Sequence, residues 1–258
     1  MTNSARPVVI AGNWKMYKTI EESIAYIKEL IPLVKDSKTQ VYLAVPFTSI
    51  NPLSKEVDDT KITIGAQNMN DVSEGAFTGE IAGPMLKDAG AKFVILGHSE
   101  RRRLFDESNT FINKKVKRAL KDGLQPILCI GETEEQRAQS KTDEVLAEQM
   151  TQCLEGINAE QIATMIIAYE PIWAIGSEVA ATPAIAQETM HTCREFIAKT
   201  WNEEAANHVV WQYGGSVKAE NAKMFLDQED IDGLLVGGAS LSAEKFSKIV
   251  NYQEVLVE

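Results

Sequence analysis

Short apolar segments alternate with longer amphipathic segments along the whole chain. The apolar segments are mostly continuous, which is typical of parallel strands that are covered on both faces. They predict strands at residues 8–11, 41–45, 62–66, 93–96, 126–130, 165–169, 209–211 and 234–236.

Helical patterns lie between these strands. Isoleucines recur at the spacing of one helix face within residues 19–34. Thr182 and Pro183 are a typical N-cap and first residue of a helix, and Gly123 is a typical helix end. The other predicted helices begin near residue 49 or span residues 84–89, 111–120, 133–154, 219–226 and 243–250.

The order of these elements predicts the fold. Strand–helix units repeat about every 30 residues, and no Gly/Ser-rich linker or change in composition divides the chain. Six units would favour an open, doubly wound sheet, whereas eight close naturally into a barrel. We therefore expect an α/β fold in which residues 1–258 form one (β/α)8 barrel domain, with eight parallel strands ringed by helices.

Charge and composition narrow the possible partners. The net charge is −11, which argues against nucleic acid or an anionic membrane as the main partner, because both need a basic face. A small anionic substrate is not excluded, since the local field of a site can oppose the net charge. No apolar run reaches the roughly 20 residues of a membrane span.

The cysteines point to a reducing compartment. Cys129, Cys153 and Cys193 form no CxxC motif, and their odd number leaves at least one thiol unpaired. The first ten residues do not have the pattern of a signal peptide. We therefore expect a cytoplasmic protein.

Two glycine pairs follow the last two predicted strands. Backbone N–H groups beside glycine can approach an anion closely, and a helix N-terminus adds partial positive charge. Either pair alone fits a tight strand-to-helix turn equally well. Both together match the phosphate site that many barrels share. The pairs are Gly214-Gly215, followed by Ser216, and Gly237-Gly238.

Unusual polar residues also follow strands 1, 4 and 6. Glu170, before Pro171, fits a helix cap or ion pair, but also a general base whose pKa burial raises toward neutrality. His98 fits a structural histidine, but also a neutral imidazole that donates to a carbonyl oxygen. Lys15 between bulky neighbours would supply positive charge, and Asn13 a hydrogen bond.

These candidates indicate one class of reaction. The chain has no HExxH or clustered Cys/His set, no GxGxxG and no Gly-x-Ser-x-Gly motif, so we expect no metal, no nicotinamide cofactor and no acyl transfer. A base, an electrophile, a cation and a phosphate clamp suit proton abstraction next to a carbonyl of a phosphorylated substrate.

The chain resembles the triosephosphate isomerase family. The resemblance implies an aldose–ketose isomerase that needs no cofactor, acts on a phosphorylated three-carbon sugar through an enediolate, and serves glycolysis and gluconeogenesis. The matching segments span the chain in order: residues 11–16, 65–68, 75–80, 97–102, 129–132, 169–176, 213–217 and 235–239.

The resemblance implies a role for each candidate residue. Glu170 would move the proton, His98 would polarise the carbonyl with Asn13 and Lys15, and Glu100 would support Lys15 and His98. In the family the histidine is neutral beside a glutamate base. Tyr213 and Cys129 would be supporting residues, although we expect Cys129 only to pack. The implied phosphate ligands are Gly176, Ser216, Gly237 and Gly238.

The resemblance also implies a lid and a homodimer. Residues 171–181 would close over the substrate and exclude water. Residues 75–80 would insert into a second subunit, with Thr78 near its site and Glu80 paired with Arg101 across the interface. The lid residues are Pro171, Ile172, Trp173, Ala174, Ile175, Ser177, Glu178, Val179, Ala180 and Ala181.

The lid departs from the family pattern at its tip. Glu178 and Val179 stand where the family usually has glycine and lysine. Glutamate tolerates a positive φ poorly and would repel a bound phosphate, so we expect slower or less complete closure. Two alternatives stay open: an isomerase of another phosphorylated sugar, and a non-catalytic barrel that binds phosphorylated metabolites.

Overall fold

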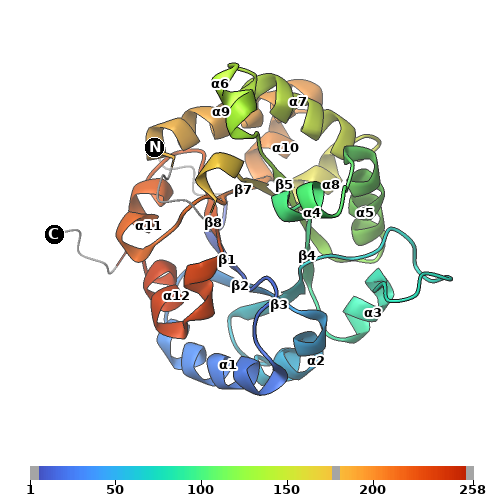
Figure 1. Ribbon diagram of the computed structural model, residues 1–258. Helices are drawn as coiled ribbons and strands as arrows, with labels where there is room; N and C mark the ends of the chain where they lie inside the picture. The colour runs from blue at the N-terminus through green and yellow to red at the C-terminus, as the bar shows by residue number, and fades with distance from the viewer. Residues whose placement is uncertain (1–5, 176–180, 254–258) are drawn as a thin grey trace.

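A computed structural model of the chain describes residues 6–175 and 181–253. Its eight strands form a closed barrel in which all neighbours are parallel, and β1 pairs with both β2 and β8 (Figure 1). This confirms the predicted fold class. The strands are β1 (Val9–Asn13), β2 (Gln40–Val45), β3 (Ile62–Ala66), β4 (Phe93–Leu96), β5 (Gln125–Ile130), β6 (Ile166–Tyr169), β7 (Val210–Tyr213) and β8 (Gly233–Val236).

Helices surround the barrel (Figure 1). The α-helices are α1 (Ile20–Val34), α2 (Phe47–Glu56), α3 (Gly83–Asp88), α4 (Ser99–Leu104), α5 (Asn109–Lys121), α6 (Glu134–Ala138), α7 (Thr142–Cys153), α8 (Ala159–Ala163), α9 (Pro183–Thr200), α10 (Glu203–His208), α11 (Ala219–Leu226) and α12 (Ala243–Val250). Two short 3-10 helices are η1 (Ile172–Ala174) and η2 (Gly238–Leu241). None of the described helices is long and apolar enough to cross a bilayer.

Both faces of the strands are buried, as their continuous apolar sequences predict. Alternate residues such as Val9 and Ala11 belong to one buried cluster, and their neighbour Ile10 belongs to another. Successive side chains of a strand point to opposite faces, so one cluster fills the barrel and the other packs beneath the helices. Gly65 leaves the space that the Phe93 ring occupies.

The prediction of one long helix over residues 133–154 is wrong. α6 ends at Ala138 and α7 begins at Thr142, because Ser140 between them has a φ of 56° and interrupts the helical backbone. The predicted ends at Thr182 and Gly123 are confirmed. Thr182 accepts a hydrogen bond from the Ile185 N–H, and Gly123 has a φ of 70° just beyond α5.

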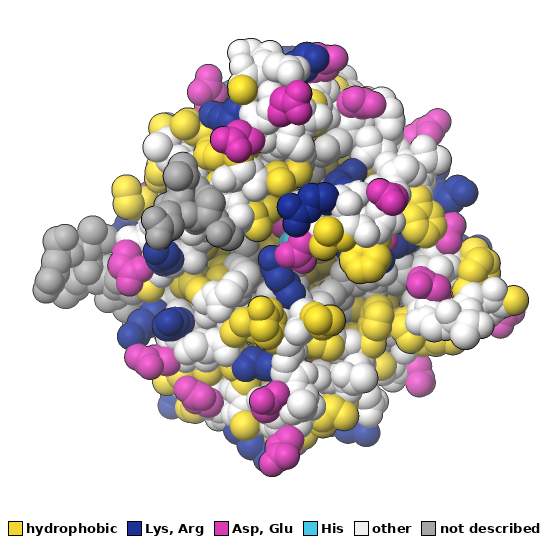
Figure 2. Space-filling view, in the orientation of Figure 1, with side chains coloured by type: hydrophobic (Ala, Val, Ile, Leu, Met, Phe, Trp, Pro, Cys, Tyr) yellow, Lys and Arg dark blue, Asp and Glu magenta, His cyan; other side chains and the backbone are white. Residues whose placement is uncertain are grey.

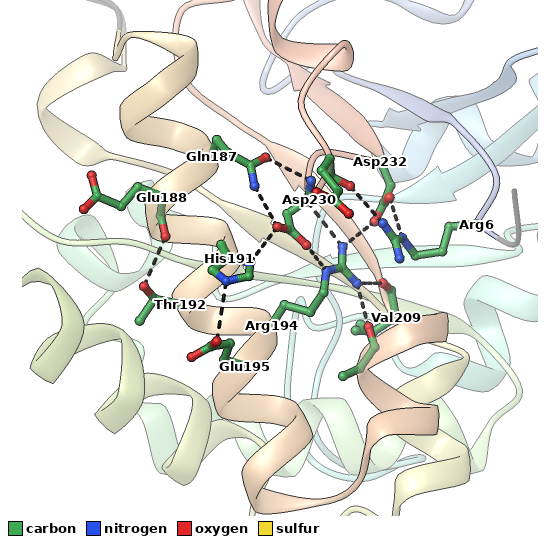
Figure 3. A network of polar contacts seen from close by, with 12 residues as sticks. Arg6, Gln187, Glu188, His191, Thr192, Arg194, Glu195, Val209, Asp230 and Asp232 are labelled. Atoms are coloured by element: carbon green, nitrogen blue, oxygen red, sulfur yellow. Dashed lines mark hydrogen bonds and ion pairs between the residues drawn. The ribbon is translucent and has the colours of Figure 1, made fainter. Parts of the chain in front are cut away.

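A buried ionic network joins α9, α10 and the start of β8 (Figure 3). Arg194 on α9 donates to Asp230 (2.6 Å), to Asp232 (2.8 Å) and to the carbonyl oxygens of Ala206 and Val209. With a fifth hydrogen bond to the Asp230 carbonyl oxygen (3.3 Å), every N–H group of this almost completely buried guanidinium has an acceptor. The network holds the amino-terminal end of the barrel, opposite the strand ends that carry the candidate site.

The connection between β3 and α3 departs most from the compact outline. It extends sideways from the barrel, on the right of the view in Figure 1. Residues 75–80 within it are exposed, including Phe77 with half of its surface accessible. This connection carries the residues that sequence analysis assigned to a subunit contact.

Candidate active site

One cavity of about 570 Å3 lies at the carboxyl ends of the strands. In a closed parallel barrel this is the end where loops from different strands meet. Seven predicted site residues line the cavity together: Asn13, Lys15, His98, Glu170, Ser216, Gly237 and Gly238. The eighth of the predicted catalytic and phosphate-binding residues, Gly176, lies outside the described residues.

Lys15 is held in an unusual backbone conformation directly after β1. Its φ is 53°, in the left-handed region that long side chains rarely adopt. The Lys15 N–H donates to Asn13 Oδ1 (3.0 Å), and its ammonium donates to Glu100 Oε1 (2.6 Å). The expected contact between Glu100 and Lys15 is therefore present, and it orients the cation at the cavity wall.

His98 lies at the N-cap of α4, and its hydrogen bonds define its neutral tautomer. The Glu100 N–H donates to Nδ1 (3.2 Å), so the ring proton sits on Nε2, which faces Glu170 Oε1 at 3.0 Å. Burial is the largest single cause and lowers the pKa of His98, but the Glu170 and Glu100 carboxylates together raise it by more, so the net shift is upward.

Glu170 follows β6 and is buried, with 2% of its surface exposed. Its Oε1 faces His98, and its Oε2 accepts a hydrogen bond from the Ser99 N–H (3.1 Å). Burial raises the pKa of Glu170, but His98 and the Ser99 N–H together lower it by more. The expectation of a raised pKa is therefore wrong for this state of the site, because both carboxylate oxygens are already bound.

Two glycines allow the backbone to fit closely around Glu170. A Cβ on Gly131 would overlap the Glu170 carbonyl oxygen, and one on Gly214 would lie 2.9 Å from Glu170 Cγ. Gly214 thus packs against Glu170, in addition to belonging to a loop that is predicted to bind phosphate. A larger residue at either position would displace the carboxylate.

The second glycine pair faces open space. A Cβ on Gly238 would meet no atom within 4 Å, although Gly238 lines the cavity and begins η2. Ser216 lines the same cavity from the β7 side. Free backbone N–H groups at a helix start, beside an open cavity, suit an anion such as phosphate.

The two predicted supporting residues differ in what they can do. Cys129 is completely buried inside the barrel, and burial, followed by the nearby Glu170 charge, raises the pKa of its thiol. A thiol in that state packs and does not react, as expected. Burial raises the pKa of Tyr213 to about 12, so its hydroxyl stays protonated beside Gly215, where a Cβ would overlap it.

The first part of the predicted lid is anchored by a residue to which we assigned no role. Glu132 is fully buried and accepts hydrogen bonds from the Trp173 indole (2.9 Å) and the Tyr169 hydroxyl (3.1 Å). The Arg137 guanidinium lies 4.6 Å from the centre of the Trp173 ring. The members of this cluster lie far apart in the sequence, so the sequence did not indicate that they meet. The lid residues Ser177, Glu178, Val179 and Ala180 lie outside the described residues.

The residues predicted to contact a second subunit have partners within their own chain. Glu80 accepts a hydrogen bond from Asn70 Nδ2 (3.0 Å), and Arg101 donates to Glu107 Oε1 (2.7 Å). Thr78 is exposed in the extended β3–α3 connection. The pairing of Glu80 with Arg101 between subunits stays a prediction.

Comparison with known proteins identifies the family. A sequence model of the family described as triosephosphate isomerase matches residues 8–253. The chain belongs to the triosephosphate isomerase family. It is 57% identical over 251 residues to the triosephosphate isomerase of Protochlamydia amoebophila, and the matched region covers 97% of this chain and 95% of that protein. It is 48% identical over 247 residues to that of Caldanaerobacter subterraneus, covering 96% and 100% of the two chains.

Membership of the triosephosphate isomerase family makes the chain an isomerase and agrees with the geometry of the site. Within residues 6–175 and 181–253, no group of three or more His, Cys, Asp or Glu side chains could hold a metal ion.

Proposed function

We propose that the chain interconverts glyceraldehyde 3-phosphate and dihydroxyacetone phosphate by proton transfer through an enediolate. One observation carries the proposal. Glu170, His98 and Lys15 converge on a cavity that the glycine pair Gly237-Gly238 also lines. A base, a neutral donor and a cation beside an anion cradle are the parts that this reaction needs.

The contacts within the site suggest how the groups become active. When Glu170 leaves His98 to reach a substrate carbon, it loses the contacts that lower its pKa, so burial dominates and its basicity increases. His98 loses the carboxylate that raises its pKa and stays neutral. Its Nε2–H is then free to donate to the substrate carbonyl oxygen, and Lys15 balances the developing negative charge.

The glycine loops and the lid would hold and enclose the substrate. We assign the phosphate to Ser216, Gly237, Gly238 and, from the family resemblance, Gly176. Residues 171–181 would close over it, which protects the enediolate phosphate from water and elimination. Asn13 would hydrogen-bond the substrate oxygens from the Lys15 side of the cavity.

We also propose a homodimer whose contact surface surrounds the β3–α3 connection. Hydrophobic side chains are exposed on that side of the barrel mouth (Figure 2). Exposed apolar patches of this kind mark protein contacts. The exposed residues near the mouth and on this connection include Met16, Tyr17, Phe47, Phe77 and Met85. A cytoplasmic location and a single domain over residues 1–258 stay predictions. The described cysteines form no disulfide bond.

A coupled assay tests the proposed reaction directly. Purified protein is given glyceraldehyde 3-phosphate with a chelator present and no added cofactor, and formation of dihydroxyacetone phosphate is followed. We expect rapid turnover that falls at least about 100-fold in Glu170→Gln. Glu160→Gln on α8 is the matched control, because that carboxylate is exposed and does not line the cavity. Equal activity of the two variants would refute the role of Glu170.

A further inference from the structure

The active-site cavity extends beyond the catalytic residues to a set of lysines. Lys218 precedes α11, and Lys245 and Lys248 lie on α12; all three line the cavity and are exposed. We call them the lysine rim. Figure 2 shows Lys and Arg side chains over α11 and α12, on the face that contains the barrel mouth.

Acidic neighbours only partly neutralise the lysine rim. Lys248 pairs with Glu244 (2.9 Å), and Glu220 also lines the cavity. Among the described residues, Lys218 and Lys245 make no ion pair within 4 Å. Three lysines against two glutamates leave the rim with one net positive charge, in a chain whose net charge is −11.

The positive charge of the lysine rim affects how an anionic ligand reaches the cavity. At long range the chain repels a phosphorylated substrate, so arrival at the cavity depends on the field at its entrance. A rim of lysines there raises the local concentration of the anion without touching the reacting atoms. The effect weakens with salt, since the Debye length falls from about 30 Å at 0.01 M to about 8 Å at 0.15 M.

We propose that the lysine rim captures the doubly charged phosphorylated substrate and guides it to the glycine loops. The inference rests on the proposed function, because it assigns the rim to substrate entry in that reaction. The rim acts before chemistry, so it raises kcat/KM and leaves kcat unchanged. Glu220 opposes it, so removing that charge improves capture.

The test compares two triple variants that change the net charge equally. Lys218→Gln/Lys245→Gln/Lys248→Gln removes the rim, and Lys55→Gln/Lys114→Gln/Lys121→Gln removes exposed lysines that do not line the cavity. At low ionic strength we expect kcat/KM to fall at least about 3-fold in the first and to change much less in the second. Glu220→Gln should raise kcat/KM. The difference between the triple variants should shrink at high salt.

A neutral substrate separates capture from damage to the site. With glyceraldehyde, which lacks the phosphate, the rim variant should retain its kcat/KM. Equal losses with both substrates, or in both triple variants, would overturn the proposal. If the unmodified protein does not isomerise triose phosphates, the proposed function fails. The rim is then judged separately by calorimetric binding of glycerol 3-phosphate, which should weaken in the rim variant and not in the control.

Discussion

At the scale of single residues, His98 and Glu170 control each other's protonation. The carboxylate of Glu170 is the main cause that raises the pKa of His98, and burial of the ring opposes it. In Glu170→Gln, burial still lowers the pKa of His98, and only the smaller contributions of Glu100 and Lys15 remain beside it. We therefore expect the pKa of His98 to fall from above its ordinary value of 6.5 to below it in this variant.

Nuclear magnetic resonance of the ring nitrogens during a pH titration measures this directly. A raised pKa means that the charged ring is stabilised, so the unmodified protein should hold the His98 proton to a higher pH than the variant does. Glu160→Gln should titrate like the unmodified protein. If His98 titrates identically in all three proteins, Glu170 does not set its charge, and the account of how the site becomes active fails.

The residues that the sequence revealed share one property. Asn13, Lys15, His98 and Glu170 are polar residues directly after apolar strands, so the repeated pattern exposes them. The Ser99 N–H at Glu170 had no such signal. Glu132 also follows an apolar strand, but no pattern in the sequence links it to Trp173, 41 residues away. Every residue except proline has a backbone N–H, so a sequence does not reveal which one donates, and this donor adds to the lowering of the Glu170 pKa by His98.

At the scale of elements, strands were easier to predict than helix breaks. Each of the eight apolar segments overlaps a strand, because burial on both faces leaves a continuous apolar run. The break between α6 and α7 depends on one residue, Ser140, whose positive φ no sequence pattern indicates. The short helices α8 and α10 lack the length that makes an apolar periodicity visible.

The network around Arg194 makes a prediction at this scale (Figure 3). Arg194→Leu would remove the cation that the buried carboxylates of Asp230 and Asp232 share and would release α9 from α10. Breaking a buried pair in this way costs about 3–5 kcal/mol. We expect urea unfolding to show a decrease of that size in the free energy of unfolding.

The matched control is Lys199→Leu on the same helix. Lys199 pairs with Glu195 on the exposed side of α9, where solvent screens the pair and it adds little to stability. A loss in Arg194→Leu no larger than in this control would mean that the network gives no stability. Activity per folded molecule should be unchanged in both variants, because neither residue lines the active-site cavity.

At the scale of the whole molecule, closure of the barrel follows from the number of units, but subunit contact does not. Eight repeats of strand and helix predict a closed sheet whatever their detailed sequences. The extension of the β3–α3 connection away from the barrel has no hydrophobic period that would reveal it. The homodimer was therefore predicted only by family resemblance, and the exposed apolar residues near the connection now support it.

Phe77→Asp tests the homodimer. Phe77 is half exposed on the extended connection, and a carboxylate there would have to be buried without a partner in a subunit contact. We expect the unmodified protein to sediment at twice the 28.5 kDa mass of the chain and Phe77→Asp to sediment at that mass. Leu33→Asp on α1 changes an exposed residue in the same way outside this surface and should remain a dimer.

We expect the Phe77→Asp variant to lose activity when it becomes a monomer. Met16 is almost fully exposed in the isolated chain and Tyr17 more than half, so the loop that carries Lys15 lacks a cover on one side. Because Lys15 has a strained φ, loss of that cover would let the ammonium move, and a displacement of about 1 Å can reduce turnover about 100-fold. A Phe77→Asp monomer with full activity would show that one subunit positions Lys15 alone. A Phe77→Asp dimer would instead place the contact on another surface.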